Sequence, residues 1–158
     1  MDREKNEDEK WMLLALKEAE KGGVRGEVPV GAVVVLRGKV VGRAFNRPIG
    51  KNDPTAHAEV LAIRQAARRA GNYRLVGCEL YVTLEPCAMC LGAAVQARVS
   101  RLVYGASDSK HGAVASLMRF PFDRMNHRPE IRNGVRAAEC RRLLMDFFRN
   151  RRRNRAAG

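Results

Sequence analysis

Hydrophobic and polar positions follow two different periods along this chain. In residues 8–21 apolar side chains recur every three or four positions, which predicts an amphipathic helix, and Gly22 and Gly23 are the pair at which we expect that helix to end. Residues 28–36 and 39–45 are instead rich in valine and separated by an Arg-Gly pair, a pattern that predicts a β-hairpin. The chain therefore opens with a helix followed by two antiparallel strands.

Further along, strand-like and helix-like segments alternate. The pattern predicts, in order, a loop at 48–54, a helix at 56–70, a strand at 80–84, a helix at 87–97, a strand at 99–104, a long loop at 105–128, a short strand at 130–132 and a basic helix and tail from about 135. Strands joined through helices pair in parallel. We expect residues 1–158 to form one domain, a three-layer α/β/α sandwich with a mixed five-stranded sheet.

Composition narrows the class of protein. Hydrophobic residues make up 46% of the 158 residues, enough to build a packed core. The first ten residues are mostly charged, unlike a secretory signal, and no apolar run approaches the roughly 20 residues that span a bilayer. We therefore expect a cytoplasmic protein without a membrane segment, whose four cysteines are kept reduced.

Charge adds a candidate partner. Thirty Lys and Arg residues against seventeen Asp and Glu residues give a net charge of +13. Residues 1–10 carry a net −2, whereas residues 121–158 carry eleven Arg and four acidic residues, a net +7. A solvated basic surface is one interpretation of this surplus, and a polyanionic partner docking near the C-terminus is the other.

Two short motifs carry the candidate chemistry. Cys87 and Cys90 are three positions apart at a predicted helix start, so that both sulfur atoms can hold one ion. With His57 they make a ligand set that suits zinc and leaves a fourth tetrahedral position open for water. Glu59, two residues after His57, is the candidate for moving protons at that water.

Each motif alone has other interpretations. A Cys-x-x-Cys pair can be a redox pair or core packing, and a closed structural zinc site would need a fourth ligand, for which Cys78 and Cys140 are the remaining thiols. Neither has metal-ligand spacing, and we expect both to pack in the core. The joint pattern of His-x-Glu followed by Pro-Cys-x-x-Cys is far more specific, because it is the signature of zinc-dependent deaminases.

Several separate motifs extend this pattern over most of the chain. They are residues 27–32 (EVPVGA), 46–48 (NRP), 53–59 (DPTAHAE), 80–90 (LYVTLEPCAMC), 104–106 (YGA) and 146–149 (DFFR). From Trp11 to about Arg153 the chain resembles the bacterial tRNA-specific adenosine deaminases of the cytidine deaminase superfamily. The resemblance implies a cytidine deaminase-like fold and hydrolytic conversion of adenosine to inosine at the wobble position of a tRNA anticodon, with a zinc-activated water.

The resemblance also assigns roles to individual residues. It implies that His57, Cys87 and Cys90 hold one zinc ion per subunit and that Glu59 transfers protons. For the flipped base, it implies a hydrogen bond from Asn46 and a pocket wall at Pro29 and Val30. For the rest of the RNA, it implies contacts of Asp108 and Lys110 with neighbouring anticodon nucleotides and an RNA-facing surface at Phe147, Arg149, Arg151 and Arg152. It further implies a homodimer that acts on the anticodon stem-loop of an arginine tRNA.

Two other functions remain open at this point. A deaminase of free bases or nucleosides would share the zinc motif, but a small neutral substrate gives no reason for a basic C-terminal helix. An RNA-binding protein with a structural zinc would account for the charge, but it would have no use for Glu59 beside the metal.

Overall fold

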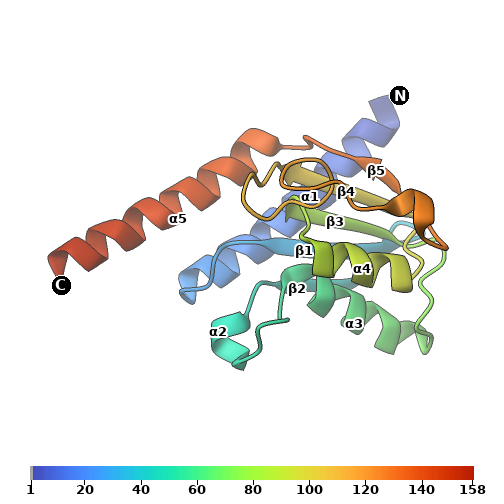
Figure 1. The fold of residues 1–158 in the computed structure, drawn as a ribbon, viewed down its shortest axis with the longest axis horizontal. Helices are drawn as coiled ribbons and strands as arrows, with labels where there is room; N and C mark the ends of the chain where they lie inside the picture. The colour runs from blue at the N-terminus through green and yellow to red at the C-terminus, as the bar shows by residue number, and fades with distance from the viewer. Residues whose placement is uncertain (1) are drawn as a thin grey trace.

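A five-stranded sheet lies at the centre of the computed structural model, which describes residues 2–158 (Figure 1). Its strand order is β2 (Lys39–Phe45), β1 (Gly31–Leu36), β3 (Glu79–Leu84), β4 (Arg101–Ala106) and β5 (Glu130–Arg132). The pairings of β1 with β2 and with β3 are antiparallel, and those of β4 with β3 and with β5 are parallel. The expected mixed five-stranded sheet is therefore confirmed.

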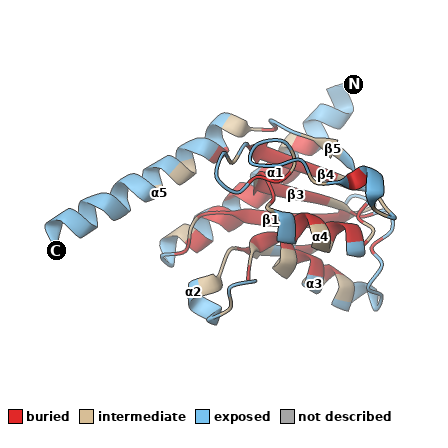
Figure 2. Ribbon diagram, in the orientation of Figure 1, coloured by how far each residue is buried: buried red, intermediate tan, exposed pale blue. Residues whose placement is uncertain are grey.

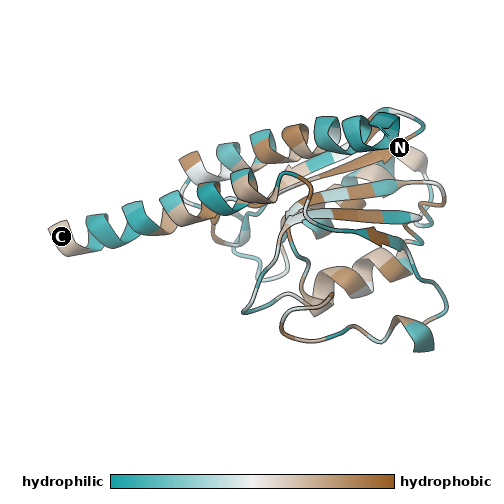
Figure 3. Cartoon of the chain, turned by 90° about the horizontal axis from the view of Figure 1, so that it is seen from above, coloured by the Kyte–Doolittle hydropathy of each residue, from teal (hydrophilic) through white to brown (hydrophobic). Residues whose placement is uncertain are grey.

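Helices cover both faces of the sheet (Figures 1 and 3). One face packs against α1 (Asp2–Val24) and the first turns of α5 (Ala137–Ala157), and the other packs against α3 (Ala58–Ala70) and α4 (Ala88–Gln96). A short helix α2 (Pro48–Lys51) interrupts the loop after β2, and a 3-10 turn spans Phe122–Arg124. None of the helices described over residues 2–158 has the length and apolar character needed to cross a membrane.

The strands divide their side chains between two core clusters because successive side chains of a strand point to opposite faces. Val33 of β1 and Tyr81 of β3 face α1 and α5, whereas Val34 and Leu80 face α3 and α4. Both sets are almost fully buried, so the strands appear as continuous buried segments in Figure 2. This explains the unbroken valine run in β1, since a strand covered on both faces does not alternate with polar residues.

Two glycines set the distance between the layers. A Cβ atom at Gly31 would collide with the carbonyl oxygen of Ala15 on α1, and one at Gly42 would collide with the carbonyl oxygen of Ala62 on α3. The helix backbones thus rest directly on the hairpin, one on each face. This close approach fixes where the N-terminus of α3 lies relative to the sheet edge.

Several element boundaries differ from the expectation, three of them with a bearing on packing or on the length of an element. The prediction that Gly22 and Gly23 end the first helix was wrong, since α1 continues to Val24. Gly22 has a packing role instead, because a Cβ there would lie 3.0 Å from the ring of Phe45. The predicted loop after β2 contains α2, and the last helix continues to Ala157.

Candidate metal centre and substrate cavity

His57 and Glu59 lie at the start of α3. His57 is the N-cap residue, with an extended backbone at φ −74° and ψ 149°, and Glu59 lies in the first turn. Two residues in a regular helix would point about 200° apart. The extended cap instead allows both side chains to line one cavity. Glu59 is only 4% exposed, so its carboxylate is shielded from bulk water.

Cys87 and Cys90 lie at the start of α4 in a similar arrangement. Cys87 is the N-cap residue, with φ −77° and ψ 172°, and Cys90 lies one turn further and is fully buried. Neither helix start has a side-chain cap of its own, because the residues at these positions point toward each other rather than toward their own backbone amides.

The three potential ligand atoms have the spacing of a metal site. His57 Nδ1 lies 3.5 Å from the Sγ of Cys87 and 3.4 Å from the Sγ of Cys90, and all three atoms lie within 4.8 Å of one another. A tetrahedral zinc with ordinary Zn–S and Zn–N bonds would separate sulfur from nitrogen by about 3.6 Å. Among residues 2–158 no fourth His, Cys, Asp or Glu joins the group, so the donor set fits zinc with one position left open.

The pKa values of these side chains are shifted because the groups lie close together and are buried. The hydrogen bond with Cys90 lowers the pKa of Cys87 to about 4 against the opposing effect of burial, and the pKa of Cys90 is raised by the same hydrogen bond. The hydrogen bond to Cys87 raises the pKa of His57. Burial raises the pKa of Glu59. Two thiol groups that compete for one proton are a favourable starting point for replacing that proton by a metal ion.

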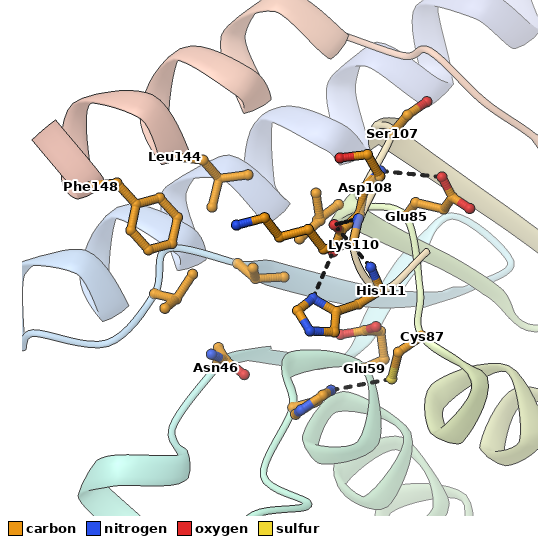
Figure 4. A pocket seen from close by; sticks show the side chains of 15 residues that line it. Asn46, Glu59, Glu85, Cys87, Ser107, Asp108, Lys110, His111, Leu144 and Phe148 are labelled. Carbon is orange, nitrogen blue, oxygen red and sulfur yellow. Dashed lines mark hydrogen bonds and ion pairs between the residues drawn. The ribbon is translucent and has the colours of Figure 1, made fainter. Parts of the chain in front are cut away.

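A cavity of about 590 Å³ opens above this group (Figure 4). His57, Glu59 and Cys87 form its floor, and Val30 and Asn46 lie on the side of the hairpin. The remaining walls come from the loop after β4 and from α5. Such a volume lies within the usual range of small-molecule sites and is open enough to admit a base that is attached to a chain.

Comparisons with known proteins identify the relatives of this chain. Residues 6–152 match the family described as MafB19-like deaminase. A tRNA-specific adenosine deaminase of Haemophilus influenzae is 50% identical over 147 residues, which cover 92% of this chain and 85% of that protein. The chain belongs to the tRNA-specific adenosine deaminase family.

Solved structures support the same conclusion. A structure from a study of A-to-I editing by tRNA:A34 deaminases at the wobble position of transfer RNA has a TM-score of 0.82 at 49% identity, covering 85% of this chain and 98% of that one. A guanine deaminase from Bacillus subtilis has a TM-score of 0.60 at 42% identity, covering 63% and 64% of the two chains. The predicted cytidine deaminase-like sandwich is thereby confirmed. As a member of this family, the chain is an enzyme.

Some residues predicted from the family resemblance lie around the cavity and others do not. Val30, Asn46, Asp108 and Lys110 line it. Pro29 is buried but is not among the lining residues. The cavity is also not lined by four predicted residues of the last helix, namely Phe147, Arg149, Arg151 and Arg152.

The carboxylate of Asp108 is engaged within its own loop. It accepts hydrogen bonds from the backbone amides of Lys110 at 3.0 Å and His111 at 3.2 Å. This arrangement is an Asx turn, which turns the chain so that Lys110 and His111 both face the cavity (Figure 4). Asp108 therefore shapes the loop as well as lining the cavity.

Among the residues of the cavity wall that the sequence analysis missed, four come from three separate segments. Leu144 and Phe148 reach it from α5, Val28 from the segment before β1, and His111 from the loop after β4. His111 is a histidine within the predicted long loop, which is a weak signal. The other three are apolar, and nothing in their type separates them from core residues.

Cys78 and Cys140 lie apart from the metal group. Both are buried, and a Cβ atom at Gly105 would collide with the sulfur of Cys140. Burial raises the pKa of the Cys140 thiol to about 12, so it stays protonated. This placement agrees with a role in packing.

Proposed function

We propose that this chain deaminates adenosine to inosine at the wobble position of a tRNA anticodon. The observation that carries the proposal is the convergence of His57, Cys87 and Cys90 beside the buried carboxylate of Glu59, at the floor of a cavity with an open side. Family membership with tRNA-specific adenosine deaminases supports the substrate.

One zinc ion per subunit would be held by His57, Cys87 and Cys90, whose spacing fits tetrahedral coordination. When bound, zinc lowers the pKa of water to about 7 and so supplies a hydroxide nucleophile at neutral pH. Glu59 would take up a proton from the attacking water and deliver it to N1 of adenine as the water oxygen adds to C6. Glu59 would then take the proton of the new hydroxyl group on C6 and pass it to the amino group, which leaves as ammonia while the C6 carbonyl of inosine forms.

The side walls of the cavity would hold the flipped base. Asn46 offers an amide that can donate and accept hydrogen bonds, and its backbone N–H donates a hydrogen bond of 3.0 Å to the carbonyl of Val30, the residue before β1. Val30 supplies an apolar surface, and the preceding Pro29 is buried and would hold Val30 in place through the backbone. On the opposite wall, Asp108 and Lys110 would meet the nucleotides on either side of the target.

The last helix would guide the RNA backbone into the cavity. Leu144 and Phe148 line the cavity, and positions seven residues later lie on the same side of an α-helix. Arg151 and Arg155 therefore lie on the same side as Leu144 and Phe148. Arg153 lies on the opposite side, because it follows Leu144 by two and a half turns. Single-stranded loops are recognised by such a combination of aromatic and cationic side chains.

Three other predicted residues flank this cationic side. Arg152 follows Phe148 by four positions and lies near the same side. The guanidinium of Arg151 lies 5.9 Å from the ring centre of Phe147, and Arg149 pairs with Asp146 at 3.7 Å. We propose that Phe147, Arg149, Arg151 and Arg152 contact the anticodon arm, with Arg151 and Arg152 nearest to it.

The finer statements about partners are proposals as well. An arginine tRNA with adenosine at the wobble position is the proposed substrate, the cytoplasm is the proposed compartment, and a homodimer is the proposed assembly. Large apolar side chains remain exposed on α4 at Met89 and in the loop after β4 at Leu117 and Met118, which supports a second copy as a partner. Light scattering of the purified protein tests the assembly.

The decisive experiment measures inosine in RNA. The zinc-loaded protein is incubated with an anticodon stem-loop of an arginine tRNA that has adenosine at the wobble position, and the digested nucleosides are analysed by mass. We expect inosine at that position, and none when guanosine replaces the adenosine. Parallel reactions contain free adenine, guanine and cytidine, and release of ammonia from these but not from the RNA would contradict the proposal.

A further inference from the structure

Glu85 is a buried carboxylate that the proposed reaction does not use. It follows β3 and lies two residues before Cys87, with 2% of its surface exposed. A carboxylate in such a place is costly unless its oxygen atoms are fully hydrogen-bonded. It is not part of the group of potential metal ligands. Its burial therefore requires another explanation.

All hydrogen bonds recorded to the Glu85 side chain come from one loop. Oε1 accepts the backbone amide of Asp108 at 3.2 Å and the hydroxyl of Ser116. Oε2 accepts the consecutive backbone amides of Val114 at 3.1 Å, Ala115 at 3.0 Å and Ser116 at 3.2 Å. One carboxylate thus holds both ends of the 107–116 loop.

The 107–116 loop carries one wall of the cavity. Ser107, Asp108, Ser109, Lys110 and His111 all line it. Glu85 lines the cavity as well, and Figure 4 shows it beside the base of this segment. The Glu85 carboxylate accepts a hydrogen bond from the amide of Asp108, and the Asp108 carboxylate in turn accepts hydrogen bonds from the amides of Lys110 and His111. The position of the cavity wall therefore depends on Glu85.

Packing leaves the loop little freedom to move away. A Cβ atom at Gly112 would collide with the carboxyl carbon of Glu85, so the loop backbone lies directly on this side chain. The amide of Ala113 donates a hydrogen bond of 2.9 Å to the carbonyl of Pro86. Glu85, Pro86 and Cys87 thus place the loop and a metal ligand from the same short turn.

We propose that Glu85 is a positioning residue that preorganises the 107–116 loop for the nucleotides flanking the target base. A loop that is already ordered does not lose this conformational freedom on binding, so preorganisation appears as affinity. Glu85 therefore acts on RNA recognition and not on the chemical step. This inference rests on the proposed function, because it presupposes that the loop meets RNA.

The test compares Glu85→Gln with the wild type on the anticodon stem-loop. The substitution keeps the shape of the side chain, but the NH2 of its amide would face backbone N–H groups that need an acceptor. We expect KM to rise roughly tenfold, the factor for one charge-assisted hydrogen bond, while kcat changes by less than about threefold. Zinc content stays at the wild-type value, and hydrogen exchange at residues 108 and 114–116 becomes faster.

Glu18→Gln is the matched control. Glu18 is also a buried carboxylate, but its partners Lys21 and Arg43 lie on α1 and β2, away from the cavity. We expect this variant to lose stability without a change in KM. If both variants lower stability and neither changes KM, Glu85 has only a structural role and the inference is wrong.

A second variant tests the same inference in case Glu85→Gln does not fold. Ser116→Ala removes one donor to the same carboxylate from an exposed loop position, and we expect a KM increase of roughly threefold with unchanged kcat. An unchanged KM in Ser116→Ala and unchanged exchange at residues 108 and 114–116 would overturn the inference. Absence of inosine with the wild-type protein would instead contradict the proposed function.

Discussion

The hydroxyl of Tyr81 on β3 donates a hydrogen bond of 2.9 Å to the carboxylate of Asp8 on α1. The same carboxylate accepts hydrogen bonds from Arg101 at 2.6 and 2.8 Å and from Arg132 at 2.5 Å. Asp8 is 1% exposed, so α1 brings a charged group into contact with three strands of the sheet. This cluster anchors the N-terminal helix at the end of the sheet away from the metal group.

We expect Asp8→Asn to destabilise the protein by about 3 kcal/mol, because it leaves the largely buried Arg101 without its main counter-charge. Urea unfolding measures the change. Glu4→Gln is the matched control, since Glu4 also pairs with Arg101, at 3.1 Å, but its side chain is 62% exposed. An exposed pair contributes less than about 1 kcal/mol. Equal effects of the two variants would contradict the assigned role of burial.

Asp8 also predicts how stability changes in acid. Burial alone would raise its pKa, but the hydrogen bonds from Arg101 and Tyr81 outweigh burial and lower the pKa below its ordinary value. A lowered pKa in the folded state means that the stabilisation is complete above the unfolded value of about 3.9 and is lost as the pH falls through the folded value. The stability difference between wild type and Asp8→Asn should therefore shrink below about pH 4 in urea titrations. A difference that grows in acid would exclude this assignment.

The metal ligands and the proton carrier should respond differently to substitution. Glu59→Gln keeps the zinc and lowers kcat about a thousandfold, because it removes the group that transfers protons. Cys87→Ala loses both zinc and activity, since only two protein ligands remain. Zinc is measured by atomic absorption after gel filtration. Stoichiometric zinc in Cys87→Ala, or normal turnover by Glu59→Gln, would contradict these roles.

The side of α5 that faces the cavity should determine the salt dependence of RNA binding. Each phosphate contact that is lost lowers the slope of log K against log salt by about 0.7 to 0.9. We expect Arg151→Gln and Arg155→Gln each to lower the slope by this amount. Arg153→Gln has the same charge change on the opposite side and should leave the slope nearly unchanged. Equal slopes for Arg153→Gln and Arg155→Gln would mean that the helix does not bind in this orientation.

Most of the features that could be predicted from the sequence follow from patterns within short segments. The hairpin was predictable from Arg37-Gly38, whose φ angles of 49° and 73° are those of a tight turn. The candidate metal group was predictable because its residues occur in two short motifs at helix starts, where spacing alone restricts the geometry. In each case the decisive contacts lie within a few residues or follow from the known combination of motifs.

Contacts between distant segments were not predictable in this way. Nothing in the sequence near Glu85 indicates that its partners lie 23 to 31 residues further along the chain. Phe147 and Phe148 are adjacent and chemically identical, and only the rotation of α5 decides that Phe148 lines the cavity. The glycines after α1 look like a helix stop, but the nearby ring of Phe45 explains Gly22 as a packing position.

The short turn that carries Glu85 and Cys87 restricts where the length of this chain can change. One inserted residue between them would rotate the start of α4 against the end of β3, and the loop anchor and the sulfur ligand would lose their common register. By contrast, the exposed connection at 71–74 after α3 can absorb insertions without moving either group. Deletion and insertion scanning should therefore find a tolerant segment behind α3 and an intolerant one between β3 and α4.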